Sequence, residues 1–337
     1  ALPGLTLMTG RTEEFEEILD NLIEDNRQRL FHKTTQVDAP LLVVTALQSY
    51  ISFGADPSHV WKKYGETVRE IVESYAPEKR DEVSLQPDGL LLAQKDNTAL
   101  TWMNAYIDGH PVTERAGYQV ETNAFWYNAL CFAIDMESRF TAKDSVFVGR
   151  WTPIRDLAKT SYVNRFWLPD LGYLADYVDN AGPNTDVRPN QIFAVSVDYS
   201  PLPDEIKASI MNIVDRELVT SRGIRTLSPR DVKYRGVYEG TQRDRDLAYH
   251  NGCAWPCLLL PYAKACFEMR GAAFCKKAEW LIEGFYDDLW KHGVGAFSEL
   301  YDGDPPHEPH GAISSAMSTA AILWVDWMIA KYKKGED

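Results

Sequence analysis

Residues 100–130, LTWMNAYIDGHPVTERAGYQVETNAFWYNAL, place two indoles, a guanidinium, a carboxylate and an amide close together in the chain: Trp102, Arg115, Glu121, Asn123 and Trp126. An aromatic ring can stack on the apolar face of a pyranose, and the polar groups can bind its hydroxyls. The stretch therefore predicts a carbohydrate-binding cleft. The alternative is purely structural: the two Trp side chains pack in the wall of the domain, and Arg115 and Glu121 form a buried ion pair.

Two later stretches place polar groups where a helix is expected to begin. They are DVRPNQIFA and AYHNGCAWP, and their candidates for substrate binding are Arg188, Gln191, His250 and Trp255. Helix capping explains part of the first stretch, because Asp186 and Pro189 suit a helix entrance. A single His such as His250 is more often structural than functional.

A fourth stretch, SELYDGDPPHEPHG, is rich in acidic and imidazole side chains: Glu299, Asp302, Asp304, His307 and His310. A carboxylate held in such a loop suits a general base that activates water. The same residues also suit a solvated acidic turn or a weak cation site. The stretch does not decide between these possibilities by itself.

The elements that must position these loops are helices. Apolar residues recur at intervals of three and four, with almost no alternating pattern, and predict about ten helices. They cover residues 13–30, 39–52, 58–75, 120–140, 144–166, 189–197, 203–218, 254–269, 274–290 and 312–332. Asp56 and Pro57 suit the N-cap and first turn of the third helix.

Long loops rich in Gly, Pro and Asp follow every second predicted helix, a pattern typical of paired helices with one functional end. No shift in composition marks a domain boundary, so residues 1–337 are expected to form one all-α domain, an (α/α)6 barrel. Six hairpins need twelve helices. The apolar leader ALPGLTLM resembles the end of a further helix, and we expect the missing part to lie upstream.

Composition limits the classes of partner. A net charge of −14 argues against nucleic acid and anionic membrane surfaces, and no apolar run approaches the length of a membrane span. The five cysteines form an odd number without a paired framework, which favours reduced thiols in the cytoplasm. Cys253 and Cys257 have a ligand-like spacing but no matching pair, so we expect no metal and no cofactor.

Five stretches, in order along nearly the whole chain, resemble the amylo-α-1,6-glucosidase domain of glycogen debranching enzymes. They are the 100–130 stretch, RPNQIFAVSVDYSPL, GIRTLSPRDVKYRGVYEG, DRDLAYHNGCAWPCLLLPY and SELYDGDPPHEPHGAISSAMS. The resemblance implies an (α/α)6 barrel that hydrolyses α-1,6-linked glucose stubs of glycogen or limit dextrin with inversion. ALPGLTLMTGR resembles the segment that follows the family's WGRDT-type substrate-binding motif.

The resemblance also implies roles for single residues. Glu299 falls on the general base of the family, and Asp38 in TQVDAPLL matches an acid near the non-reducing sugar, with helix N-capping as its alternative. The general acid of the family is the Asp that ends TWMD, where this chain has Asn104. An amide cannot protonate a leaving oxygen, whereas inversion needs an acid and a base about 6.5–9.5 Å apart.

Three interpretations of Asn104 follow. Another carboxylate, Asp108 or Glu121, replaces the acid; or the Asn was introduced to trap substrate; or the domain binds glycan without cleaving it. Glu114, Ser315 and Met317 also differ from the residues usual in the family, and these smaller differences concern substrate preference.

We therefore predict an amylo-α-1,6-glucosidase-type glycoside hydrolase with Glu299, Asn104 and Glu121 as catalytic candidates. The expected partners are α-glucans (glycogen, limit dextrin and maltooligosaccharides) and an upstream domain of the same polypeptide. The expected substrate-binding residues are Asp38, Trp102, Arg115, Asn123, Trp126, Arg188, Gln191, His250 and Trp255. The alternatives are a silent glycan-binding module and, third, a sugar epimerase that uses His250, His307 and His310.

Overall fold

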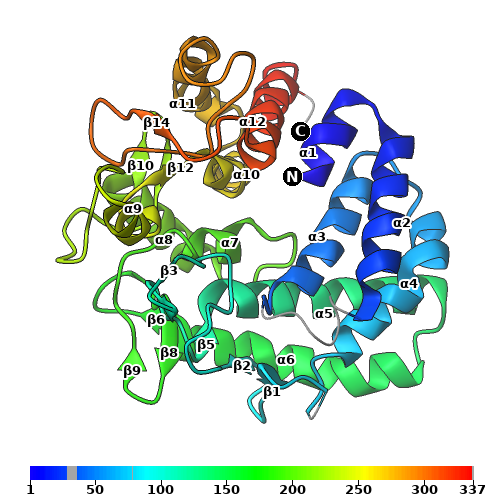
Figure 1. Ribbon diagram of the computed structural model, residues 1–337. Helices are drawn as coiled ribbons and strands as arrows, with labels where there is room; N and C mark the ends of the chain where they lie inside the picture. Colours follow the sequence, from blue (N-terminus) through cyan, green and yellow to red (C-terminus); the bar gives the residue numbers. More distant parts are fainter. Residues whose placement is uncertain (29–35, 78, 336–337) are drawn as a thin grey trace.

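The computed structural model describes residues 1–28, 36–77 and 79–335. Their helices follow one another round the molecule in chain order (Figure 1). The α-helices are α1 (Leu2–Thr6), α2 (Thr12–Gln28), α3 (Ala39–Ser52), α4 (Pro57–Glu73), α5 (Val120–Phe140), α6 (Val146–Phe166), α7 (Gln191–Ser196), α8 (Asp204–Glu217), α9 (Gln242–Tyr249), α10 (Leu259–Arg270), α11 (Cys275–Asp288) and α12 (Ala316–Lys333). Short 3₁₀ helices are η1 (Leu7–Thr9), η3 (Pro256–Leu258) and η4 (Gly271–Phe274).

Six helices form a closed inner ring. In order, α1, α3, α5, α7, α10 and α12 each pack on the next, and α12 packs back on α1. The last contact is close, because a Cβ atom at Gly4 of α1 would lie 2.6 Å from the carbonyl oxygen of Ala320 on α12. The described residues add five outer helices, α2, α4, α6, α8 and α11. The chain therefore has the (α/α)6 barrel fold that the sequence predicts, and the leader ALPGLTLM supplies the helix that completes the inner ring.

The predicted helices agree well with the observed ones. The ranges 39–52 and 120–140 match α3 and α5. Asp56 caps α4, with its carboxylate accepting from the Ser58 backbone N–H over 3.1 Å. Pro189 was expected in a first turn, but α7 begins later, at Gln191. The helix expected over 254–269 begins later too, because its first two residues form a strand, and α9 was not predicted.

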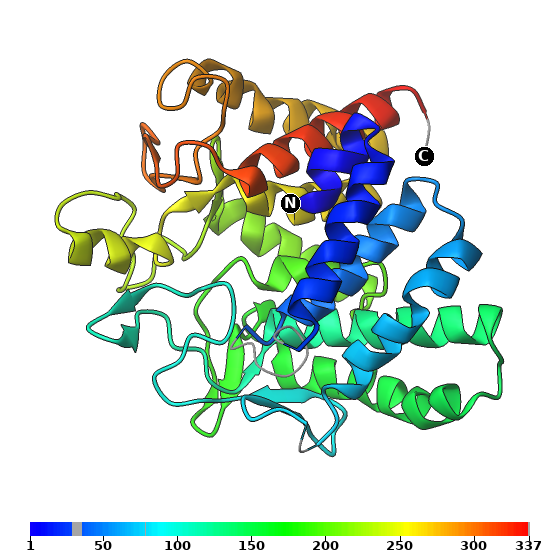
Figure 2. The ribbon, with the colours of Figure 1, turned by 45° about the vertical axis from the view of Figure 1, so that its right-hand side comes forward.

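Short strands lie in the long loops between outer and inner helices. They are β1 (Val83–Leu85), β2 (Leu91–Ala93), β3 (Tyr106–Ile107), β4 (His110–Pro111), β5 (Tyr118–Gln119), β6 (Trp167–Leu168), β7 (Tyr173–Leu174), β8 (Tyr177–Asp179), β9 (Gly182–Pro183), β10 (Val219–Thr220), β11 (Gly223–Arg225), β12 (Ala254–Trp255), β13 (Leu300–Tyr301) and β14 (Pro309–His310). The largest sheet is antiparallel, in the order β10-β11-β12-β13-β14. Figure 2 shows α9, the β3-β4 hairpin and the loop before β14 on one side of the molecule, the loop-bearing end.

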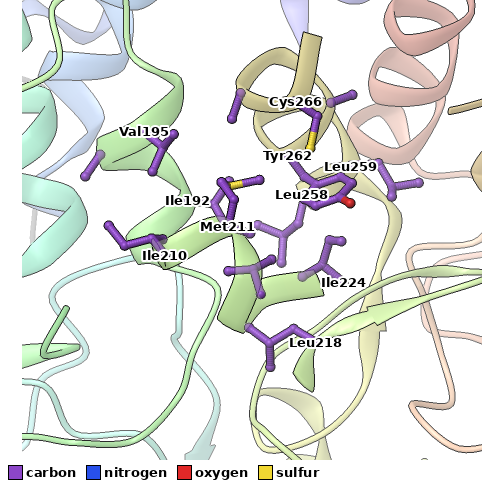
Figure 3. Packing of buried hydrophobic residues seen from close by; sticks show 14 of the residues in the cluster. Ile192, Val195, Ile210, Met211, Leu218, Ile224, Leu258, Leu259, Tyr262 and Cys266 are labelled. Atoms are coloured by element: carbon purple, nitrogen blue, oxygen red, sulfur yellow. The ribbon is translucent and has the colours of Figure 1, made fainter. Parts of the chain in front are cut away.

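The core has two clusters of buried apolar side chains. One lies among α2, α3, α4 and α5, and the other among α7, α8, α10, α11 and α12, where Ile192, Met211 and Leu259 pack together (Figure 3). Phe193 and Tyr199 contact both clusters. Helix α5 is buried along most of its length, because α3, α4, α6 and α7 all pack on it. This packing holds the loop-bearing end in place. No described helix is long and apolar enough to span a bilayer.

Candidate functional site

A cavity of about 470 Å³ lies inside the inner ring, with α1, α3, α7, α10 and α12 contributing to its wall. Its polar and aromatic lining includes Asp38, Trp102, Asn104, Tyr249, Trp255 and Glu299. Its apolar lining includes Leu42, Phe193, Leu258, Met317 and Trp324. The cavity thus combines indole faces with a few hydrogen-bonding groups, as a sugar-binding site requires.

Glu299 is half-buried and precedes β13. Its Oε1 accepts a hydrogen bond from the Tyr249 hydroxyl over 2.8 Å, and its Oε2 accepts one from the Ala312 backbone N–H over 3.0 Å. Gly311, with φ of +73°, permits the second contact, because a Cβ there would lie 2.5 Å from Oε2. Each carboxylate oxygen of Glu299 thus accepts one hydrogen bond, and a carboxylate is a group that can act as a general base.

Asp38 lies at the N-cap position of α3, but its side chain makes no capping hydrogen bond. The carboxyl lines the cavity instead, and the residue is 5% exposed. Burial, together with the nearby charge of Glu121, raises the pKa of Asp38 to about 7. Below that pH the group is a neutral acid that can donate a hydrogen bond.

Asn104 is exposed and lines the same cavity, directly before the β3-β4 hairpin. The tip of this hairpin carries Asp108, whose side chain is 81% exposed and pairs with Arg243 of α9 over 2.7 Å. Asp108 does not line the cavity. The amide of Asn104, and not the carboxylate of Asp108, therefore lines the cavity.

Arg115 and Glu121 form the buried ion pair that was the structural alternative. The guanidinium contacts both oxygens of Glu121, the Nη2–Oε2 distance being 2.6 Å, and it also contacts Asp176 Oδ2 over 2.6 Å. Asp176 accepts from Asn190 over 2.7 Å, and Asn190 accepts from the Trp102 indole over 2.8 Å. Neither Arg115 nor Glu121 lines the cavity, but this chain of contacts orients the Trp102 ring, which does.

Replacing Arg115 tests this network. Arg115→Met leaves Glu121 and Asp176 without their buried partner, so we expect the free energy of unfolding to fall by about 3–5 kcal/mol. Arg139→Met is the matched control, because Arg139 pairs with Asp135 at the surface, where such a pair contributes roughly 0.3–0.5 kcal/mol. Urea unfolding followed by circular dichroism measures both. Equal midpoints for the two variants would contradict a stabilising role for the network.

Four other sequence candidates lie in the scaffold and not at the cavity. They are Asn123, Trp126, Arg188 and Gln191, each at most 4% exposed. Asn123 binds both the N–H and the carbonyl of Leu91 in β2. The Trp126 indole donates to the Gly89 carbonyl over 3.0 Å.

Arg188 and Gln191 bind loop backbone in the same way. Arg188 donates to the His250 carbonyl over 2.7 Å, and Gln191 accepts from the Leu174 N–H over 3.2 Å. The sequence predicted direct sugar contact for all four residues. In the structure none of the four lines the cavity, and their polar groups bind mainly the backbone of the loops around it.

His250 is fully buried beneath the cavity wall, stacked on Trp255 at 5.3 Å between ring centroids and edge-on to Trp102 at 5.2 Å. Burial, reinforced by Arg188 and Arg115, lowers the pKa of His250 to about 3, so the imidazole stays neutral. The described residues that line the cavity include none of His250, His307 and His310. The acid and base roles that an epimerase would assign to these residues have no support in this geometry.

Tyr249 is the functional candidate that the sequence interpretation missed. It lines the cavity, donates to Glu299 and ends α9. A signal was present in TQRD, because Thr241 and Asp244 form a capping box that starts this helix. Only the fold shows that the end of α9 reaches Glu299.

A groove of about 540 Å³ lies between α11 and α12, lined by Glu279, Tyr286, Asp326 and Lys333 among others, and it shares no residue with the cavity. In the described part of the chain, no group of three or more His, Cys, Asp or Glu side chains is placed to hold a metal ion. The five cysteines are unpaired.

Comparison with known proteins agrees with this architecture. A rhamnosidase from Klebsiella oxytoca, solved with rhamnose bound, superposes on this chain with a TM-score of 0.52 at 14% sequence identity. The superposition covers 89% of this chain and 47% of the rhamnosidase chain, and this likeness shows the fold alone. The glycogen debranching enzyme of Saccharomyces cerevisiae is 24% identical in an alignment that covers 64% of this chain and 17% of that protein. Residues 1–324 match the family described as Amylo-alpha-1,6-glucosidase, so the chain belongs to this glycosidase family.

Proposed function

We propose that the domain hydrolyses α-1,6-linked glucose stubs of glycogen or limit dextrin with inversion, with Glu299 as the general base and position 104 as the site of the general acid. The yeast relative is named a glycogen debranching enzyme, and the chain spans only 17% of it, so this activity is a proposal for the chain. The proposed substrates are α-glucans, including maltooligosaccharides.

One observation carries the proposal: the carboxylate of Glu299 lines the same cavity as the Trp102 and Trp255 indoles, with donors on both of its oxygens. A glucose unit stacked on an indole would present its anomeric carbon to water held by Glu299. The base removes a proton as this water attacks, and the glycosidic bond breaks on the opposite face of the sugar.

The leaving oxygen needs a proton, and Asn104 cannot supply one. Glu121 is fully buried and engaged by Arg115, and Asp108 is solvent-exposed, so their positions favour neither as a replacement acid. Among the residues that line the cavity, the carboxyl groups are Asp38 and Glu299. We assign Asp38 to substrate binding, where its protonated form would donate a hydrogen bond to a sugar oxygen.

Asn104 favours one alternative, a glycan-binding domain without hydrolytic activity. This alternative uses the same cavity and the same indoles but needs no acid. The upstream domain and the cytoplasmic location remain predictions from the sequence, as does the extent of the domain over residues 1–337.

Binding of glucan tests both versions of the proposal. Maltooligosaccharides that carry an α-1,6 branch should quench tryptophan fluorescence, because the sugar would stack on Trp102 or Trp255 inside the cavity. Trp102→Ala should reduce the quench, whereas Trp290→Ala, which removes an indole that is 75% exposed outside the cavity, should not. A flat titration of the folded protein would contradict a carbohydrate site of either kind.

A further inference from the structure

The carboxylate of Glu299 depends on one side chain for the position of its Oε1 atom. The donor is the hydroxyl of Tyr249, 2.8 Å away, and the other oxygen is held by the backbone N–H of Ala312. The backbone contact needs a glycine at position 311 but no side-chain donor. The contact at Oε1 depends on the Tyr249 side chain itself, so it is the adjustable part of the environment of Glu299.

Tyr249 is itself held firmly. Helix α9 begins at a complete capping box and ends at Tyr249, whose carbonyl accepts from the Trp255 indole over 3.0 Å. The ring packs edge-on against His250 at 4.7 Å and Trp255 at 4.9 Å between centroids. The hydroxyl therefore reaches Glu299 from a ring that has little freedom to turn.

The direction of this hydrogen bond follows from the two groups. Burial, and then the hydrogen bond to Glu299, raises the pKa of Tyr249 well above its usual range, so the phenol keeps its proton and donates it. A donated hydrogen bond favours the ionised carboxylate over the neutral acid. It also occupies one lone pair of Oε1 and fixes the plane of the carboxylate, which sets the direction from which water can be bound.

We propose that Tyr249 is a positioning residue for Glu299: its hydroxyl orients the carboxylate toward the water, and as a hydrogen-bond donor it favours the carboxylate over the protonated acid. This inference rests on the proposed function for its catalytic consequence, but the effect on the titration of Glu299 does not depend on activity.

Few neighbouring groups titrate in a way that would mask the effect. Tyr238 comes from the loop before α9, Cys257 comes from η3, and Asp38 lines the same cavity. Burial raises the pKa of Tyr238 above its usual value and that of Cys257 to about 12, so both stay neutral. Burial raises the pKa of Asp38 to about 7, so Asp38 is one group to monitor. His310 of β14, which contacts Asp302 over 3.0 Å and directly precedes Gly311, is the other.

The experiment is a carboxyl ¹³C NMR titration of protein labelled with [5-¹³C]glutamate, in which Glu299→Gln assigns the signal of Glu299. Tyr249→Phe removes only the hydroxyl, and we expect the midpoint of Glu299 to rise by about one pH unit. Tyr238→Phe is the matched control, because the Tyr238 ring lies 6.0 Å from that of Tyr249 between centroids and its hydroxyl does not bind Glu299. In this variant the midpoint of Glu299 should not change. An unchanged midpoint in Tyr249→Phe would overturn the proposal.

A second variant covers the case in which Tyr249→Phe does not fold. Incorporation of 3-fluorotyrosine at position 249 keeps the ring and strengthens the donor, so the midpoint of Glu299 should fall. A midpoint that stays the same or rises would count against the proposal.

Hydrolysis of α-glucosyl fluoride separates this inference from the proposed function. If the site is hydrolytic, Tyr249→Phe should lower kcat by about tenfold or more, move the acid limb of the pH profile upward and leave KM nearly unchanged. If no variant hydrolyses the fluoride yet the titration shift is present, the positioning role stands and the hydrolytic function is wrong. If hydrolysis occurs and neither the limb nor the midpoint moves, the positioning role is wrong.

Discussion

Glu299→Gln is expected to lower the hydrolysis of α-glucosyl fluoride by about 10²–10⁴-fold, the contribution of a positioned general base. The amide has the same shape as the carboxylate, so the cavity and its contact with Tyr249 should persist. Fluoride release measures the rate. Proton NMR measures the anomer, which should be β-glucose for the starting protein if the reaction inverts configuration.

Glu308→Gln is the control for this prediction, because Glu308 is exposed in the same loop and does not line the cavity. It should hydrolyse the fluoride at the starting rate. Glucan binding, measured by tryptophan fluorescence, should survive in both variants. A Glu299→Gln protein that keeps its rate would exclude Glu299 as the base.

Asn104→Asp is expected to raise the cleavage of limit dextrin by roughly a hundredfold or more, because it places a carboxyl group where the leaving oxygen needs a proton. The effect should depend on the leaving group. Fluoride departs with little protonation, so the rate on α-glucosyl fluoride should change much less than the rate on dextrin. Released glucose measures dextrin cleavage.

Asn180→Asp is the control for the added charge, since Asn180 is exposed between β8 and β9 and does not line the cavity. If the starting protein already cleaves dextrin well and Asn104→Asp adds nothing, another group is the acid. Asp38→Asn should then be examined first, because Asp38 lines the cavity, and Glu121→Gln and Asp108→Asn afterwards. If both proteins bind glucan and neither cleaves dextrin or the fluoride, the glycan-binding alternative is supported.

The local elements of this protein could be predicted from the sequence. Apolar residues at intervals of three and four place α3 and α5 at their observed bounds, because a helix that packs on a core needs that spacing. The capping signal at Asp56 locates the start of α4, because the side chain satisfies a free backbone N–H. The segments that make the family recognisable are likewise contiguous in the chain.

The roles of single polar residues required the tertiary structure. Arg188 and Asn123 have side chains that suit a sugar, and the sequence cannot show that their partners are backbone groups of distant loops. Glu121 and Asp38 are both acids near a helix start. Glu121 forms an ion pair with Arg115, whereas burial raises the pKa of Asp38 to about 7. Burial and the charges of neighbours set these differences, and both depend on contacts between remote segments.

The sequence by itself determined most of the helical segments, though not α9, and it also determined that they pair and that the long loops between pairs carry the candidate chemistry. These properties depend on the spacing of residues along one segment. Tertiary structure alone decided which side chains face the cavity. The contact between Tyr249 and Glu299 joins residues 50 positions apart, and the ring closes only where α1 meets α12 at opposite ends of the chain. A contact of this kind depends on how the hairpins pack, which no local pattern of residues records.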